Sequence, residues 1–174
     1  FVLFESGQPT HVFDLDKLSG GCIVVRKAKE GESFLPLGEG ATPITLTSDD
    51  LVIADAEKPV ALAGVKGGAE TAVTNETKNI LIESAIFNPV TVRESSRRPK
   101  ITSDSSFRFE RGVSPLQIES SANRLASLLL DVSGGELCSG AIVAGSDLPT
   151  QLVVSMRTDY CRQRLGLEIS DESM

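Results

Sequence analysis

Short apolar runs separated by polar and glycine-rich segments dominate the first half of the chain. Such runs, bounded by turn-forming residues, are typical of β-strands. The pattern predicts strands within GCIVVRKA, LVIA, VALAGV and NILIESAIF, at residues 21–28, 51–54, 60–65 and 79–87. A turn at Glu57–Lys58–Pro59 is expected between the second run and the third. Near the C-terminal end, AIVAG (141–145) and QLVVSM (151–156) are predicted to be further strands.

Three segments have the pattern expected of helices. Asn88–Pro89 offers an N-cap and a first-turn proline for a short helix that must end before Pro99. Ser114–Gln117 has the form of a capping box, and the helix after it is closed by Gly134–Gly135. DYCRQRLG (159–166) is the third. We therefore expect an α+β protein with a predominantly β core, a barrel-like mixed sheet, and about three helices packed around it.

Composition is that of an ordinary globular protein. The 174 residues are 40% apolar with a mean hydropathy near zero, enough for one core or two small lobes. No apolar run approaches the ~18 residues that a membrane span needs, and the first residues do not show the basic, apolar and small-residue pattern expected of a signal peptide. The three cysteines are far apart, which favours buried free thiols in the reducing cytoplasm over a disulfide or zinc site. Both ends look cut, so we interpret the chain as an excised domain.

Charge is distributed unevenly along the chain. The net charge is −7, yet the segment Arg93–Arg111 holds six of the 17 Lys and Arg residues against three acids. Such a segment can mark a docking place for an anion, or it can be an ordinary salt-bridged surface. Both interpretations remain open at this point.

A carboxylate and a histidine are the residues best suited to chemistry. Glu83 lies inside the apolar run ILIESAIF, where an unpaired charge would be costly to bury. Either an arginine pairs with it, or it waits for a hydrogen-bond donor from a ligand. His11 is the only histidine, and Asp14 is its one local acidic partner. No Gly-x-Ser-x-Gly elbow is present, so a nucleophilic triad is not favoured. The hydroxyls of the SDSS segment, at 103–106, can equally be turn and capping groups.

The order of several motifs carries more information than any of them alone. GQPTHVFDLDKL, DLVIAD, ALAGVKGG, ILIESAIFNPVTVR, SRR and TSDSSFRFERGVSP follow one another along the chain. From residue 1 to about residue 145 this succession resembles the bacterial-type phenylalanyl-tRNA synthetase β subunit family, in the module between its N-terminal and later domains. The resemblance implies a tRNA-editing domain at 1–150 that hydrolyses tyrosine wrongly attached to phenylalanine tRNA. Residues 151–174 then begin the following module or form a C-terminal extension.

The resemblance also implies roles for individual residues. Glu83 matches the glutamate that recognises the tyrosine hydroxyl, and His11 and Ser103 are the candidate catalytic residues, placing the attacking water or the terminal ribose. The remaining implied residues shape the substrate pocket (Ala63, Gly64, Gly67, Ser105) or contact RNA phosphates (Arg97, Arg98, Lys100). Lys66 departs from the family pattern, which has an apolar residue in the glycine loop.

Partners and cofactors follow from the same resemblance. The expected partners are the tRNA acceptor end carrying tyrosine, the remaining β-subunit domains and the α subunit, with neither a membrane nor DNA. No cofactor or metal is expected here, because ATP and magnesium belong to the synthetic site of the α subunit. One alternative is a non-catalytic module that orients tRNA and has a degenerate pocket filled by Lys66. Another is a free-standing domain that clears mischarged tRNA in trans.

Overall fold

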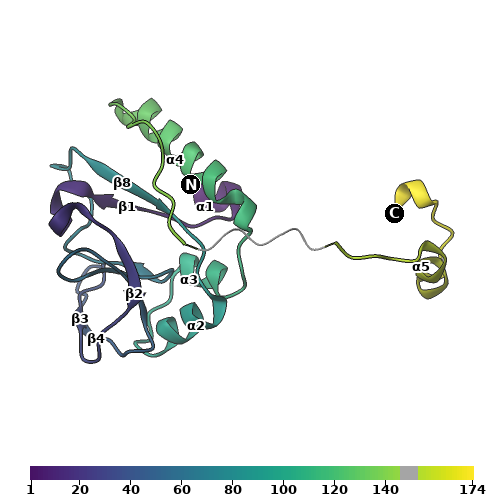
Figure 1. The fold of residues 1–174 in the computed structure, drawn as a ribbon, viewed down its shortest axis with the longest axis horizontal. Coiled ribbons are helices and arrows are strands. Elements are labelled where there is room, and N and C mark those ends of the chain that lie inside the picture. Colours follow the sequence, from purple (N-terminus) through teal and green to yellow (C-terminus); the bar gives the residue numbers. More distant parts are fainter. Residues whose placement is uncertain (146–152) are drawn as a thin grey trace. The chain divides into compact units, whose positions relative to one another are not determined.

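The computed structural model describes residues 1–145 and 153–174 (Figure 1). The chain divides into two units, Phe1–Ala141 and Ile142–Met174, and the first contains nearly all of the regular structure. The expected domain boundary after residue 150 lies outside the described residues, as do Gln151 and Leu152 of the predicted last strand.

Three separate antiparallel sheets make up the β part of the first unit. They are β1–β8 (Thr10–Asp14, Ile80–Ser84), β2–β5–β6–β7 (Val24–Lys27, Leu51–Ala54, Pro59–Leu62, Lys66–Gly67) and β3–β4 (Ser33–Phe34, Ile44–Thr45). All pairings among the described strands are antiparallel. The predicted α+β class with its β core is confirmed. The sheets do not close into a barrel, because β1 and β8 pair only with each other in the described part. The sheets are also not mixed, because the described strands pair only in the antiparallel sense.

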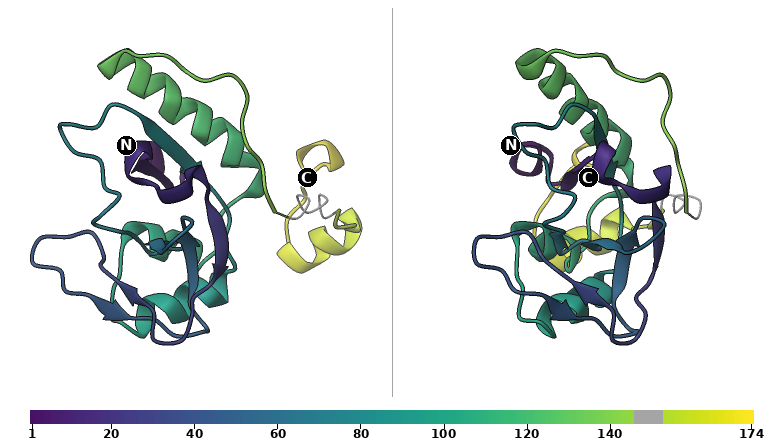
Figure 2. Two further views of the ribbon diagram at one scale, coloured as in Figure 1. Left: turned by 60° about the vertical axis from the view of Figure 1, so that its left-hand side comes forward. Right: turned by 90° about the vertical axis from the view of Figure 1, so that its left-hand side faces the viewer.

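In the first unit, α1 and α4 lie beside β1 and β8, and α2 and α3 lie at the other end of the β core (Figures 1 and 2). The α-helices are α1 (Val2–Ser6), α2 (Pro89–Arg97), α3 (Asp104–Phe109), α4 (Ile118–Ser133) and, in the second unit, α5 (Thr158–Leu165). Short 3-10 helices occupy Leu15–Lys17, Ser19–Gly21, Pro115–Gln117 and Asp171–Ser173. Asn88 caps α2 as predicted, since its side chain accepts hydrogen bonds from the backbone N–H groups of Val90 and Thr91.

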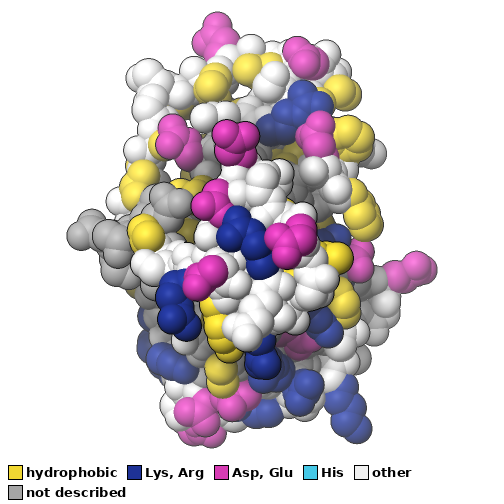
Figure 3. Space-filling model, turned by 90° about the vertical axis from the view of Figure 1, so that its right-hand side faces the viewer, with side chains coloured by type: hydrophobic (Ala, Val, Ile, Leu, Met, Phe, Trp, Pro, Cys, Tyr) yellow, Lys and Arg dark blue, Asp and Glu magenta, His cyan; other side chains and the backbone are white. Residues whose placement is uncertain are grey.

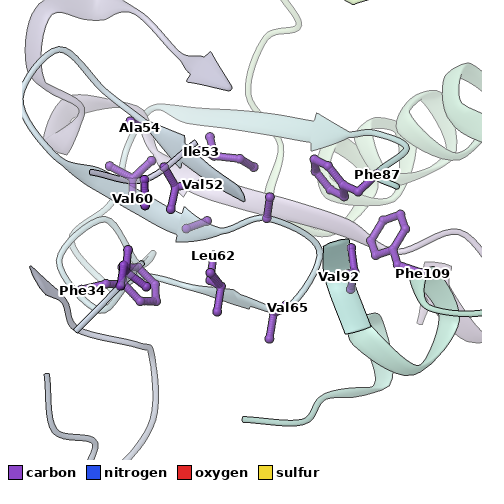
Figure 4. Packing of buried hydrophobic residues seen from close by; sticks show 14 of the residues in the cluster. Phe34, Val52, Ile53, Ala54, Val60, Leu62, Val65, Phe87, Val92 and Phe109 are labelled. Carbon is purple, nitrogen blue, oxygen red and sulfur yellow. The ribbon is translucent and has the colours of Figure 1, made fainter. Parts of the chain in front are cut away.

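One hydrophobic core holds the sheets to α2 and α3 (Figure 4). Ile53 and Leu62 of the four-stranded sheet are almost fully buried. Val92 of α2 and Phe109 of α3 reach the same core, where the rings of Phe109 and Phe87 meet edge to face with centroids 5.1 Å apart. This packing fixes α3 against the loop that follows β6.

The two-stranded sheet β1–β8 has one face on α4 and the other on the core. The Ser84 hydroxyl donates a hydrogen bond of 2.9 Å to the Ile118 carbonyl oxygen at the start of α4. Phe13, on the opposite face, is fully buried. Glu5 of α1 pairs with Arg124 of α4 and holds α1 beside α4. Side chains of odd number on β1 and β8 therefore point away from α4.

Most predicted elements are present, and three predictions fail. The strands predicted within 21–28, 51–54, 60–65 and 79–87 are present as β2, β5, β6 and β8, and the three predicted helices are present as α2, α4 and α5. AIVAG forms no strand; Ile142 and Val143 are almost fully exposed, and no neighbouring strand pairs with them. Residues 153–156 are not a strand either. Ser114 makes no capping hydrogen bond, because Pro115–Gln117 form a 3-10 turn and α4 begins only at Ile118.

The cysteines are free but not buried, which corrects the prediction. Cys22 and Cys138 are exposed and Cys161 is partly exposed. In the ranges 1–145 and 153–174, no helix has both the length and the apolar character required for a membrane span.

Candidate functional site

His11 on β1 and Glu83 on β8 are directly opposite each other in the antiparallel register. Phe13 and Leu81 form the next pair on the same face of this sheet. Opposite residues of an antiparallel pair have Cβ atoms about 4.5–5.5 Å apart. The two ionisable side chains singled out in the sequence thus come together on the face turned away from α4.

Glu83 is a partly buried carboxylate without a protein partner. Among the described residues, no side chain or backbone group forms a hydrogen bond or ion pair with it. Burial raises the pKa of the Glu83 carboxyl to about 7. The alternative in which an arginine of the basic segment pairs with Glu83 is wrong: Arg98 pairs with Asp50, and Arg111 pairs with Glu110.

His11 presents a neutral imidazole at the same place. Its Nε2 atom is buried and has no hydrogen-bond partner within the described part of the chain. Burial lowers the pKa of the His11 ring, and the ring contacts Phe13 edge-on at a centroid distance of 4.5 Å. Asp14 does not orient His11, because its carboxylate accepts a hydrogen bond of 2.6 Å from the Thr77 hydroxyl and pairs with Lys17. A His–Asp pair of the triad type is therefore not formed.

Gly67 gives the His11 ring its space. A Cβ atom at Gly67 would lie 2.4 Å from Cε1 and 2.6 Å from Nε2 of His11, far inside van der Waals contact. Successive residues of a strand point to opposite faces, so Lys66 extends away from the side that Gly67 turns to His11. This orientation speaks against a pocket filled by Lys66.

The other small residues of the loop face the core. A Cβ atom at Gly64, which has a positive φ of 70°, would lie 2.9 Å from the Phe87 ring and 3.0 Å from Val92. Ala63 is buried in the hydrophobic cluster. Their small size is therefore explained by packing between the loop and the aromatic residues of the core.

Two serine hydroxyls fasten α3 to this loop. The Ser103 hydroxyl donates to the Val65 carbonyl at 2.6 Å and accepts from the Ser106 backbone N–H at 3.0 Å. Ser103 and Ser106 form a complete capping box at the start of α3. The Ser105 hydroxyl donates to the Gly64 carbonyl at 3.2 Å. We call the arrangement that these contacts connect the carboxylate–imidazole site. It consists of Glu83, His11 and Gly67, with Ser103 and Ser105 joined to it through the loop.

The predicted RNA contacts lie on a different surface. Arg97, Arg98 and Lys100 are exposed around the end of α2. Arg98 is engaged, since one of its nitrogens lies 2.6 Å from the buried carboxylate of Asp50. Figure 3 shows Lys and Arg side chains in the lower part of one face, with Asp and Glu side chains among them.

Gln8 is a buried polar residue that the sequence pattern did not single out. It is fully buried, and its Nε2 donates to the carbonyl oxygens of Ala85 at 2.8 Å and Pro9 at 3.1 Å. Its Oε1 is buried without a partner among the described residues. Gln8 holds the end of β8 against the start of β1, two residues beyond Glu83. A glutamine in a Gly-Gln-Pro segment gives no sequence signal for such burial.

Two surface recesses lie outside the carboxylate–imidazole site. One of about 390 Å³ is lined by residues including Leu46, Asp50 and Arg98. The other, of about 280 Å³, includes Phe34, Lys58 and Glu70. In the described ranges, no three His, Cys, Asp or Glu side chains converge in a way that could hold a metal ion.

Comparisons with known proteins converge on one family. A family model described as the B3/4 domain matches residues 1–134. The phenylalanine–tRNA ligase beta subunit of Halalkalibacterium halodurans is 42% identical over 174 residues, which is all of this chain and 21% of that protein. The corresponding subunits of Yersinia pestis (43% identity) and Desulfotalea psychrophila (45%) also match all of this chain over 22% and 21% of their own lengths. The chain therefore spans about a fifth of the length of the curated relatives it matches.

Proposed function

The chain belongs to the B3/4 domain family, in the form carried by phenylalanine–tRNA ligase beta subunits, and we propose that it hydrolyses tyrosine from phenylalanine tRNA. In this proposal the carboxylate–imidazole site is the editing site. The ester bond between tyrosine and the terminal ribose is cleaved by water, which gives free tyrosine and a free ribose hydroxyl.

The observation that carries the proposal is the unpaired, partly buried carboxylate of Glu83 opposite His11. Leaving a carboxylate half-buried without a donor costs stability, and a fold has no reason to retain it for packing. A phenol O–H is a neutral donor that can satisfy such a group. Phenylalanine has no donor to offer and would leave the carboxylate desolvated.

Recognition of tyrosine through its hydroxyl is the reverse of the selection available at the site where the amino acid is first attached to tRNA. A pocket shaped for phenylalanine cannot strongly reject an isostere that only adds a hydroxyl, with discrimination of only about a hundredfold. A second site that binds through the added hydroxyl rejects the analogue lacking it much more strongly. Glu83 is assigned this specificity role.

Hydrolysis of an aminoacyl ester needs a positioned water more than a strong nucleophile, because the ester is already activated. His11, neutral as a result of burial, has a nitrogen lone pair that can hold that water or the ribose hydroxyl. Ser103 acts as a positioning residue, since its hydroxyl is engaged with Val65 and Ser106 and fixes the loop that ends at Gly67. Ala63, Gly64 and Ser105 support the same loop.

The wider assembly belongs to the same proposal. The substrate is the tRNA acceptor end carrying tyrosine, delivered by the rest of a beta subunit together with an alpha subunit. Arg97 and Lys100 contact phosphates, and Arg98 does so in addition to its pairing with Asp50. ATP and magnesium serve the synthetic reaction of the parent ligase elsewhere in the assembly, and the cytoplasm is the compartment that this role requires.

The test is deacylation of tyrosyl- and phenylalanyl-tRNA by the wild-type chain, Glu83→Ala and the control Glu119→Ala, an exposed acid on α4. Glu83→Ala should lose about 10- to 100-fold of the preference for the tyrosyl ester, since hydrogen bonds to charged groups contribute about 1.5–3 kcal/mol. Glu119→Ala should behave as wild type. An unchanged preference in Glu83→Ala would remove the specificity role.

One observation favours a second candidate, a non-catalytic module that only orients tRNA. Neither of the two recesses described above includes Glu83, His11 or Gly67. This candidate predicts that the wild-type chain, combined with its partner subunits, leaves tyrosyl-tRNA intact while still binding tRNA.

A further inference from the structure

Phe107 is an exposed aromatic residue whose position packing does not explain. It lies on α3, two residues before the buried Phe109, and 55% of its surface is exposed. Phe109 reaches the core and contacts Phe87, whereas Phe107 does not belong to the buried cluster. A single exposed apolar side chain needs no partner by itself, so the groups that contact the Phe107 ring decide what it can do.

One face of the Phe107 ring is already covered by a fixed cation. The guanidinium carbon of Arg111 lies 3.6 Å from the ring centroid. The same guanidinium donates to the Phe107 carbonyl at 2.9 Å and pairs with the Glu110 carboxylate. These contacts hold the planar cation in place, and the exposed remainder of the ring is available to a second flat group.

Positive charge surrounds this stack in a chain that is otherwise acidic. Arg108 is exposed at the next position of α3, and Arg93 of α2 donates to the Glu110 carbonyl at 3.2 Å. A nucleic-acid base stacks well on aromatic rings and on arginine planes, and the phosphates of the same strand are attracted to exposed arginines.

Helix α3 connects this stack to the carboxylate–imidazole site. Ser103 and Ser105, at its start, bind the carbonyl groups of Val65 and Gly64. Phe107 follows Ser103 by four residues, about 6 Å along a helix axis. An RNA whose terminal nucleotide reaches the site would therefore have a preceding base within reach of α3.

We propose that Phe107, stacked on Arg111, is a base-stacking site for the unpaired 3′ end of an RNA, with Arg108 and Arg93 near its phosphates. This inference rests on the proposed function only in identifying that RNA as a tRNA acceptor end. The ring supplies affinity and register for the strand, and it takes no part in the hydrolysis.

The test is the affinity of the chain for a fluorescent single-stranded RNA of twelve nucleotides ending in CCA. Phe107→Leu should weaken binding about tenfold, because stacking of one base contributes roughly 1–3 kcal/mol. Phe107→Trp should retain the wild-type affinity. The control is Phe4→Leu, which changes a still more exposed phenylalanine on α1 and should bind as wild type. Urea denaturation would establish that all variants are folded.

Three outcomes would overturn the proposal. They are no measurable RNA binding by the wild-type chain, equal binding by Phe107→Leu, and equal weakening by Phe4→Leu. If Phe107→Leu keeps its RNA affinity but associates less well with the partner subunits, the ring belongs to a protein interface instead. Hydrolysis of tyrosine methyl ester, which has no RNA, should be unchanged in Phe107→Leu. If the chain hydrolyses no tyrosyl ester and the RNA result still holds, the proposed function fails and the stacking site stands.

Discussion

His11 and Glu83 are cross-strand neighbours on β1 and β8, separated by 71 intervening residues in the chain. Burial acts on both in the direction of neutrality, lowering the pKa of His11 and raising that of Glu83. Near pH 7 the site therefore contains a neutral imidazole beside a carboxyl group close to its midpoint of titration. Such a pair is well suited to recognise a neutral phenol and to place water.

The stability of the chain should depend on pH through Glu83. Its pKa is about 7 in the folded state against 4.5 in the unfolded state, so between these values the folded state binds more protons. The contribution of Glu83 to stability is therefore full below pH 4.5 and is lost as pH rises through 7, by at most about 3 kcal/mol. Glu83→Gln should match wild type in urea denaturation at pH 4.5 and exceed it at pH 8. A difference that does not change with pH would contradict the assignment.

Gly67→Ala should disturb the site through His11. The added methyl group would overlap the imidazole ring, and overpacking of this kind costs about 1–3 kcal/mol. In a His11→Ala background the methyl group has room, so most of the cost should disappear. A double-mutant cycle by urea denaturation measures this coupling. Additive effects would mean that the close approach of Gly67 to His11 is not the cause.

Ser103→Ala should destabilise the chain by about 1–3 kcal/mol, because it removes both the N-cap of α3 and the bond to Val65. Ser114→Ala is the matched control, since Ser114 makes no capping bond despite its favourable sequence. Thermal and urea unfolding of the two variants check the difference. Equal destabilisation would show that Ser114 caps a helix in solution.

The three basic residues at the end of α2, Arg97, Arg98 and Lys100, should differ in their effect on stability. Arg97→Ala and Lys100→Ala should each lower the affinity for tRNA uniformly and reduce its salt dependence by about one ion, with little change in stability. Arg98→Ala should also destabilise the fold, because it leaves the buried carboxylate of Asp50 without its cation. Filter binding across a salt series and urea denaturation distinguish the three. If Arg98→Ala is as stable as the other two, the pairing with Asp50 is not maintained in solution.

The sequence was informative where local pattern decides structure. The apolar neighbours of Glu83 correctly indicated that its side chain is partly buried, and Asn88–Pro89 marked the start of α2. The cross-strand pairing of His11 with Glu83 was not predictable, because the register of strands so distant in sequence is set by tertiary packing.

Local pattern failed where two segments carried equal signals. Ser103 and Ser114 both precede a helix, but only Ser103 caps one, since its helix is also fastened to the loop at Val65. AIVAG has the composition of a strand without any strand beside it, and composition cannot supply a partner.

The close approach of Gly67 to His11 has an evolutionary consequence. A side chain at position 67 is compatible only with a smaller group at position 11, so the two positions are expected to vary together among homologous chains. Under the proposed function, chains that have lost editing are expected to lose the glycine and the histidine together.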